Sequence, residues 1–212
     1  MTPSPMPADE AVLIKKALRG ERDAFYQLIR PYERMVYATA ITVLKNPADA
    51  EEVAQEAILK AFAGLANFRG DSKFSTWLLQ ITYNEAKIRL RKARRYVHES
   101  IEMKATNTKG GEFWPKDFAD WRPIPSEVLE EEEVRELVYE AINSLEPMYR
   151  EVLVLRDVEL LSIKETMTIL GISEGSVKTR LRRARLQLRD ALAPGFDGCW
   201  IRRQPYRKVR AW

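Results

Sequence analysis

The sequence predicts an all-α protein made of two small helical domains joined by a long linker. Apolar residues recur at helical spacing through both halves of the 212-residue chain, and no alternating β pattern of useful length appears. Between the two halves the periodicity stops at a stretch that contains Gly110-Gly111, Pro115, Pro123 and Pro125. These observations divide the chain into an extension (1–20), a first domain (21–96), a linker (97–126), a second domain (127–193) and a basic tail (194–212).

In the first half, helices are expected in order at Asp9–Arg19, Asp23–Tyr32, Glu33–Leu44, Asp49–Leu65 and Phe74–Arg95. Gly20, Pro31 and Asn46-Pro47 separate the early ones, because Gly and Pro favour breaks. The 30-residue linker can span roughly 100 Å when extended. It carries the aromatic residues Phe113, Trp114, Phe118 and Trp121, which have no assigned role. Helices then resume at Glu127–Ser144, Pro147–Asp157, Ser162–Leu170 and Ser173–Leu192.

Composition excludes several classes of protein. With 45% apolar and 31% charged residues, the chain is expected to be soluble with a real core. One Cys and one His cannot build a disulfide framework or a metal site, so no metal or cofactor is expected. Apolar runs are too short to cross a membrane, and Met1–Glu10 does not resemble a signal peptide. A cytoplasmic location is therefore expected.

The net charge of +4 hides three basic blocks. Glu85–Arg95 carries +5, while Glu174–Asp190 and the tail from Gly195 to Trp212 carry +4 each. Separate basic blocks favour several contacts with a polyanion, whereas the acidic blocks favour protein partners. Each block taken alone is equally compatible with a solvated helix face. The tail has no assigned role.

Leu161–Leu192 has the layout of a helix-turn-helix: a short helix begins at Ser162, Gly171 ends it, and Ser173 caps a second, basic helix. Val177, Leu181, Ala184 and Leu188 form its core stripe. The outward residues suit groove and phosphate contacts, although a basic exposed helix in a bundle is the alternative. These candidate DNA-binding residues are Ser176, Lys178, Thr179, Arg180, Arg182 and Arg183.

The helix over Asp49–Leu65 pairs an apolar core side with an acidic outer side that includes one exposed leucine, Leu59. Solvation explains the acidic residues but explains Leu59 less well, so a docking surface is expected. Its members are Asp49, Glu52, Gln55, Glu56 and Leu59.

The helix over Phe74–Arg95 has a polar and basic side that suits phosphates and base edges. Its aromatic residues Phe74, Trp77 and Tyr83 fit a core role better than base stacking. The candidate DNA-binding residues on and just before this helix are Lys73, Trp77, Gln80, Asn84, Lys87 and Arg91.

These motifs resemble bacterial sigma factors. Pro147–Leu192 (PMYREVLVLRDVELLSIKETMTILGISEGSVKTRLRRARLQLRDAL) looks like sigma region four, particularly that of the extracytoplasmic-function group. Asn46–Phe62 (NPADAEEVAQEAILKAF) and Phe68–Arg95 (FRGDSKFSTWLLQITYNEAKIRLRKARR) are similar to region two. Thr166-Met167 departs from the family's usual Ile-Ala pair, which puts the packing between the two helices of the motif in question.

The resemblance implies a division of labour. The second domain would read the minus-thirty-five promoter element, and the helix over Phe74–Arg95 would recognise and melt the minus-ten element, with a flipped base received by the Phe68–Ser75 loop. The acidic helix would bind the β′ coiled coil of core RNA polymerase, whose β subunit is a further expected contact. Promoter DNA and an anti-sigma factor complete the candidate partners, and membrane insertion is not expected.

The resemblance implies a specificity subunit that is not itself an enzyme. A stand-alone helix-turn-helix regulator is the alternative, although it has no need of the acidic helix or of the first basic helix. An interaction-only adaptor and a nucleic-acid-modifying enzyme with an unrecognised site are less consistent with the sequence.

Overall fold

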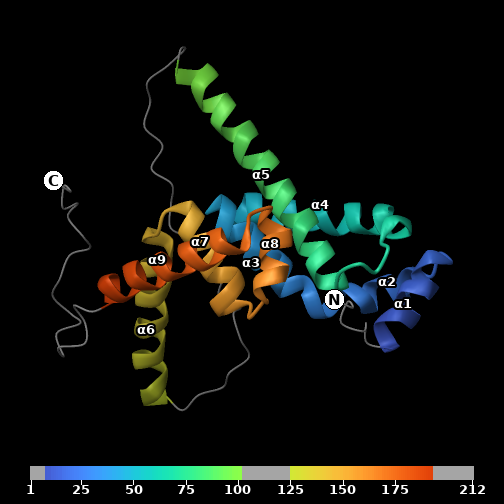
Figure 1. The fold of residues 1–212 in the computed structure, drawn as a ribbon, viewed down its shortest axis with the longest axis horizontal. Coiled ribbons are helices and arrows are strands. Elements are labelled where there is room, and N and C mark those ends of the chain that lie inside the picture. The colour runs from blue at the N-terminus through green and yellow to red at the C-terminus, as the bar shows by residue number, and fades with distance from the viewer. Residues whose placement is uncertain (1–7, 102–124, 193–212) are drawn as a thin grey trace.

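The computed structural model describes residues 8–101 and 125–192, and every regular element in these two ranges is helical (Figure 1). The all-α prediction is confirmed. The linker aromatics and the basic tail lie outside these ranges. Within them, no helix is both long enough and apolar enough to cross a bilayer.

The first half of the chain folds into a bundle whose longest helix projects well beyond the body of the molecule (Figure 1). Its elements are α1 (Ala8–Leu18), α2 (Arg22–Ile29), the 3₁₀ turn η1 (Arg30–Tyr32), α3 (Glu33–Leu44), α4 (Pro47–Gly64), the 3₁₀ turn η2 (Leu65–Asn67) and α5 (Phe74–Ile101). Lys45 ends α3 in a left-handed conformation, and the Asn46 side chain caps α4 by accepting from the backbone N–H of Asp49 at 3.1 Å. The break expected at Asn46-Pro47 is therefore built from a C-cap followed directly by an N-cap.

Both ends of this bundle differ from the simple division of the sequence. The helix α1, within the segment expected as an extension, packs on α2 and contributes the buried Ile14 and Ala17 to the core. The Tyr32 hydroxyl donates to the Glu10 carboxylate, and burial together with this carboxylate raises the pKa of Tyr32. At the other end, α5 continues to Ile101, several residues into the range expected as linker.

The second half contains α6 (Pro125–Ser144), α7 (Pro147–Leu153), a π-helical turn η3 (Val154–Val158), α8 (Ile163–Leu170) and α9 (Glu174–Leu192). Ser162 and Glu165 form a reciprocal capping box at the start of α8. Gly171 ends α8 with a φ of +64°, a conformation that glycine adopts without steric cost. The local signals that predicted the helix-turn-helix are all used in the structure.

Thr166 and Met167 are accommodated within this second half. Thr166 is fully buried, and its hydroxyl donates to the Ser162 carbonyl at 3.0 Å, so the buried oxygen is satisfied. Met167 is half-buried and, like Ile163 and Leu170, packs against the buried cluster that contains Val152 and Val177. A flexible thioether side chain can fill such an irregular gap.

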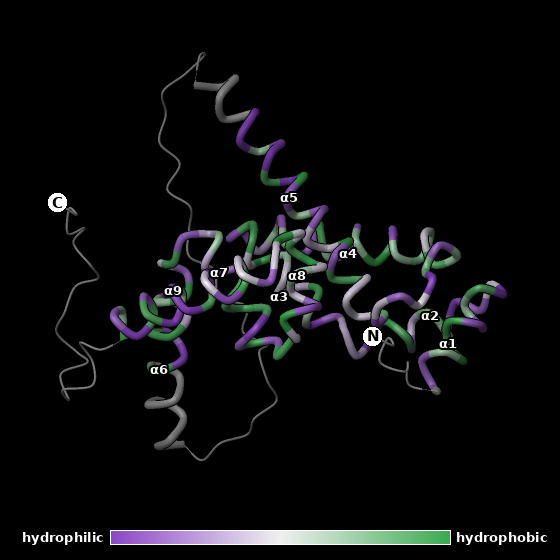
Figure 2. The backbone as a smooth tube through the Cα atoms, viewed as in Figure 1, coloured by the Kyte–Doolittle hydropathy of each residue, from purple (hydrophilic) through white to green (hydrophobic). Residues whose placement is uncertain are grey.

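The two halves pack against each other. Leu155, Leu161 and Ile169 of the second half belong to the same buried cluster as Leu78 and Leu79 of α5. A separate cluster around Val152, Leu153 and Val177 forms the second half's own core. Figure 1 shows α7 and α8 lying across α3 and α5. In Figure 2 many of the residues near this crossing are hydrophobic.

Candidate nucleic-acid interface

The basic helix α9 is held by one apolar face. Val177, Leu181 and Ala184 are buried against Tyr149 and Val152, and Leu188 is partly buried at the same cluster. Ser173 precedes the helix and accepts from the backbone N–H of Ser176 at 3.3 Å, which satisfies one free donor of the first turn. The predicted core stripe and N-cap are both confirmed.

The outward residues of α9 differ in their surroundings. Lys178, Thr179, Arg182 and Arg183 are exposed, whereas Ser176 and Arg180 are half-buried. The Lys178 ammonium lies 2.6 Å from the Glu174 carboxylate one turn earlier, and this contact lowers the pKa of Glu174. A guanidinium nitrogen of Arg183 lies 3.4 Å from the Tyr149 hydroxyl. The helix thus presents four exposed candidates on a rigid, capped support.

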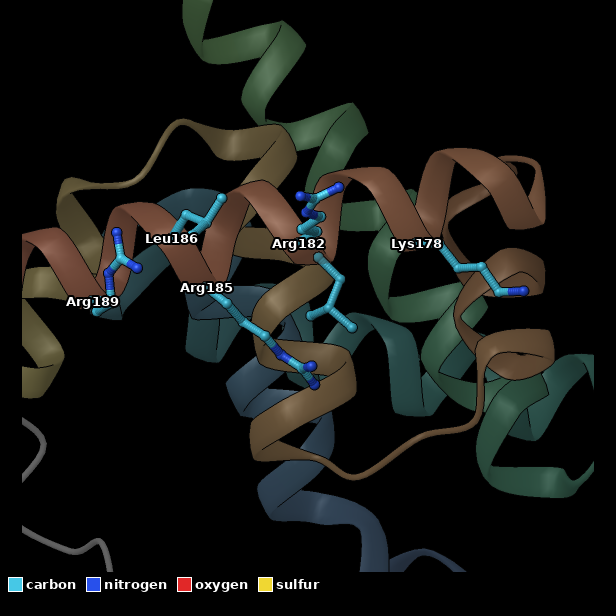
Figure 3. Close-up of a pocket in the computed structure, with 6 residues that line it drawn as sticks. Lys178, Arg182, Arg185, Leu186 and Arg189 are labelled. Atoms are coloured by element: carbon cyan, nitrogen blue, oxygen red, sulfur yellow. The ribbon is translucent and has the colours of Figure 1, made fainter.

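A shallow groove of about 460 Å³ runs along one side of α9 (Figure 3). Its lining residues are Lys178, Leu181, Arg182, Arg185, Leu186 and Arg189. Arg185 forks onto the carboxylate of Asp157 at 2.7 and 2.8 Å, and this hydrogen bonding raises the pKa of Arg185. The sequence analysis did not single out Arg185 or Arg189. The successive steps from Lys178 through Arg182 and Arg185 to Arg189 are four, three and four residues, which places all of them on the same side of the helix.

The candidate residues of the first domain follow a stripe along α5. Lys73 just before the helix, Asn84 and Arg91 are exposed, and Trp77, Gln80 and Lys87 are half-buried. Trp77 stacks at a tilt against Phe68 and Phe74, with ring centroids 5.3 and 5.8 Å away. Phe74 is completely buried, so the aromatic residues here serve mainly as core, as the sequence predicted.

Two lysines of this stripe contact carboxylates of the second half. The Lys73 ammonium lies 2.9 Å from Glu165 of α8, and the Lys87 ammonium lies 2.8 Å from Glu151 of α7. The Tyr83 hydroxyl donates to the other oxygen of Glu151 at 2.8 Å. Burial, reinforced by this carboxylate, raises the pKa of Tyr83. No pattern in the sequence predicted these contacts.

The Glu165 carboxyl is both a helix cap and an interdomain partner. Burial opposes its ionisation, but hydrogen bonds from Ser162 and Lys73 outweigh that effect and lower its pKa below the ordinary value. Glu165 is therefore ionised at neutral pH and holds a full charge beside Lys73.

Beside Glu151 an open groove of about 560 Å³ separates α5 from the start of α7 and from α9. Its basic side chains are Lys87, Arg91 and Arg94 from α5 and Arg180 from α9, and Leu90 and Met148 add apolar surface. Candidate residues of both DNA-binding helices thus line one groove.

The acidic face of α4 is exposed as predicted, except that Asp49 is half-buried. Arg89 of α5 forks onto Asp49 and Glu52, with shortest distances of 2.7 Å to each, so these two carboxylates also fix α4 against α5. Glu56 pairs with Lys60 at 3.4 Å, and Gln55 is exposed. Leu59 is 67% exposed, and Phe62 one turn later is also exposed. An apolar pair beside acidic residues is a suitable protein-docking surface.

In the described ranges no three His, Cys, Asp or Glu side chains are grouped so that they could hold a metal ion. The interfaces above instead consist of cations, amides, hydroxyls and a few exposed apolar groups.

Comparisons with known proteins match both halves of the chain. The family described as Sigma-70 region 2 matches residues 28–96, and the family described as Sigma-70, region 4 matches residues 135–188. The chain is 32% identical to the RNA polymerase sigma-H factor of Pseudomonas aeruginosa, over 86% of this chain and 93% of that protein. It is also 32% identical to the ECF RNA polymerase sigma factor SigW of Bacillus subtilis, over 84% and 94% of the two chains.

Solved structures show the same fold. The sigma factor RpoE in complex with the anti-sigma factor NepR from Bartonella quintana matches with a TM-score of 0.65 and 24% identity, over 81% of this chain and 98% of that one. CnrH in complex with the cytosolic domain of CnrY matches with a TM-score of 0.57 and 23% identity, over 88% and 99%.

Proposed function

The chain belongs to the ECF group of RNA polymerase sigma factors, and from this membership we propose that it binds core RNA polymerase and directs the enzyme to promoters. One observation carries the proposal: a single chain combines an acidic and apolar docking face on α4 with two basic helices, α5 and α9. A stand-alone regulator would need only α9.

The second domain is proposed to read the minus-thirty-five element. The capped N-terminus of α9 presents Ser176 and Thr179 together with Lys178, Arg180, Arg182 and Arg183. Short hydroxyl side chains permit close approach to a major groove, and arginines can bond guanine edges or phosphates.

The first domain is proposed to recognise and open the minus-ten element through Lys73, Trp77, Gln80, Asn84, Lys87 and Arg91. Amide side chains suit base edges, and the cations suit phosphates. Because an opened strand exposes its bases, the half-buried Trp77 provides an aromatic surface beside them.

Polymerase docking is proposed for Gln55, Glu56 and Leu59, with Asp49 and Glu52 at the edge that faces Arg89. The β′ coiled coil is the proposed contact, and the β subunit is a second. The structural relatives RpoE and CnrH are in complexes with an anti-sigma factor and with the cytosolic domain of CnrY, so a regulator of that kind is a proposed partner here too.

The chain's relatives are initiation factors rather than enzymes, and catalysis is assigned to the polymerase core. Because the chain is proposed to act together with that polymerase, we infer a cytoplasmic location.

Reconstituted transcription tests the proposal. Purified chain added to core polymerase is expected to yield transcripts from a promoter library whose start sites share one pair of upstream elements. Core polymerase alone provides the background. Failure to co-purify with core polymerase, combined with no transcripts above background, would contradict the proposed function.

A further inference from the structure

The basic helix α9 is anchored unevenly along its length. Its buried residues Val177, Leu181 and Ala184 all lie before Arg185. Further along the helix Leu188 is only partly buried, and Leu186 is exposed. Apolar burial has no preferred direction. This packing therefore fixes the position of α9 better than it fixes the rotation of α9 about its own axis.

A directional contact begins where the buried residues end. The Nε and Nη2 groups of Arg185 donate to the two carboxylate oxygens of Asp157 at 2.8 and 2.7 Å. Asp157 belongs to η3, the π-helical turn that precedes α8, so this fork joins α9 to another element of the same domain. Figure 3 shows the Arg185 side chain leaving α9 on a different course from those of Arg182 and Arg189, toward that turn.

The fork has the geometry to set a rotation. Two parallel N–H···O bonds between a planar guanidinium and a planar carboxylate fix an angle as well as a distance. Side chains extend to about 5–6 Å from the axis of a helix, so a rotation of about 10° displaces their ends by about 1 Å. A binding surface needs its side chains within about 0.5 Å of the productive geometry. Small rotations of α9 would thus disturb base contacts by Thr179 and Arg183.

Stability is a weaker explanation of this pair. The Arg185 and Asp157 side chains are 57% and 31% exposed, and ion pairs with this exposure contribute little to folding. Asp157 also places a negative charge beside a helix that is proposed to bind DNA, and like charges brought together oppose binding. Its presence there favours a role that outweighs this repulsion.

We propose that Arg185 and Asp157 are a positioning pair for promoter reading, whose fork holds α9 at the rotation that brings its outward side chains onto the bases of the upstream element. The inference rests on the proposed function and adds how the reading helix is oriented. Neither residue has to touch DNA in this role. Loss of Asp157 should therefore weaken base reading, although it removes a negative charge from the DNA-binding domain.

The test uses the full chain bound to core polymerase and a promoter library in which only the upstream element varies. The specificity ratio is the binding of the upstream sequence preferred by wild type divided by the binding of a scrambled one. Asp157→Asn and Arg185→Lys are each expected to lower this ratio about tenfold, roughly the effect of weakening one good base contact. Lysine keeps the positive charge but cannot form the fork.

Asp190→Asn is the matched control. Asp190 pairs at 2.7 Å with its own neighbour Arg189, so this change removes one negative charge from α9 without breaking a contact to another element. Its specificity ratio is expected to stay within about twofold of wild type, because the pair is exposed. Circular dichroism and melting temperatures within about 3 °C of wild type verify that the variants fold.

An exchanged pair, Asp157→Arg with Arg185→Asp, lets the fork form in the opposite direction and is expected to recover the specificity ratio to within about threefold of wild type. A phosphate contact by Arg185 predicts the opposite pattern. Asp157→Asn would then strengthen binding to every sequence, Arg185→Lys would be nearly normal, and the exchanged pair would be defective. That pattern would overturn the proposal.

An unchanged specificity ratio in Asp157→Asn and Arg185→Lys, or an equal loss in Asp190→Asn, would also overturn the positioning role, and the proposed function would stand. Absence of any upstream preference in the wild-type chain with core polymerase would contradict the proposed function instead.

Discussion

Leu160 adopts a backbone conformation that suits glycine rather than leucine. Its φ is +54°, in the left-handed region, and its side chain is 81% exposed, so no packing compensates for the strain. The left-handed conformation costs about 1–2 kcal/mol for a residue with a Cβ. Strain of this kind persists where the surrounding structure imposes it, and here the neighbours Glu159 and Leu161 are both buried.

Leu160→Gly is expected to stabilise the protein by about 0.5–1 kcal/mol, the relief of strain less the entropy that glycine adds to the unfolded chain. Thermal unfolding measures the change. Leu160→Ala is the control, because alanine keeps the Cβ while it removes the exposed side chain. Equal stabilisation by both variants would attribute the effect to the side chain and not to the backbone.

Glu159 is a buried carboxylate with an incomplete set of partners among the described residues. Its side chain is 1% exposed, one oxygen is buried without a hydrogen-bond partner among the described residues, and the Arg34 guanidinium lies 3.8 Å from the other. Burial raises the pKa of Glu159 above its ordinary value of 4.5, and Arg34 offsets only part of this effect. Ionised Glu159 therefore destabilises the folded state.

Because the pKa is raised in the folded state, the destabilisation appears as pH rises through that pKa and disappears below about the ordinary value. Glu159→Gln is expected to raise stability near pH 8 by about 1 kcal/mol, the size expected for relief of an unsatisfied buried group. It should change stability little near pH 4. Melting curves at several pH values measure this difference, and a gain that is independent of pH would contradict the assignment.

At the scale of single helices, the residues that fix α4 in the fold differ in part from the residues proposed to dock. Asp49 and Glu52 are held by Arg89, so charge reversal at Glu52 would disturb the packing of α4 on α5 as well as any docking. Leu59 contributes little to the folded state because it is mostly exposed. It is therefore the cleaner probe of the docking face.

Leu59→Asp is expected to weaken binding to core polymerase by about tenfold or more, since a charge placed in an apolar contact costs a few kcal/mol, while the circular dichroism spectrum stays unchanged. Val12→Asp on α1 is the control, as it also places a charge on an exposed apolar residue. Affinity is measured by titration of labelled chain with core polymerase. Equal losses in the two variants would remove Leu59 from the docking face.

The arginines of α9 are expected to differ in role, some contacting bases and others contacting phosphates. Arg183→Ala should cost about 1–3 kcal/mol and relax the base preference at one or two promoter positions, while Arg182→Ala should weaken all promoters alike and reduce the salt slope by about one. Selection from a promoter library at two salt concentrations separates the two patterns. An Arg183→Ala profile parallel to wild type would assign Arg183 to the phosphate backbone.

At the scale of the whole molecule, the free chain is expected to bind promoter duplex weakly. Lys73 and Lys87 are paired with Glu165 and Glu151 of the second half, and the acidic face of α4 repels DNA until a partner covers it. Specific binding and permanganate-reactive thymines are therefore expected only after core polymerase is added. Nanomolar, sequence-specific binding by the chain alone at physiological salt, with no gain from core polymerase, would favour a stand-alone regulator.

The sequence predicted the helices closely because their caps are local. Asn46, Ser162, Gly171 and Ser173 each act within three or four residues of their own position. The faces of α4 and α9 followed from periodicity for the same reason.

The interdomain packing was not predictable in this way. Glu151 and Lys87 are 64 residues apart, and nothing in the run Tyr149–Leu155 shows that its two charged residues would be buried with the apolar ones. The π-helical turn at Val154–Val158 also shifts the helical phase, so a 3.6-residue period does not describe which side of this segment faces α5. The long linker expected between the domains gave no indication that they would pack together, whereas apolar and ionic side-chain contacts join them in the structure.

Arg150 joins the ends of two helices from different halves of the chain. Its guanidinium is buried and donates to the carbonyl oxygen of Thr42 near the end of α3 and to that of Leu145 just after α6, at 2.9 and 3.2 Å. When the two halves are packed, the Thr42 carbonyl completes the hydrogen bonds of this buried guanidinium, and removal of such a partner from a buried charge is costly. In calorimetric terms the two halves are therefore coupled, and the free chain should melt as one cooperative unit.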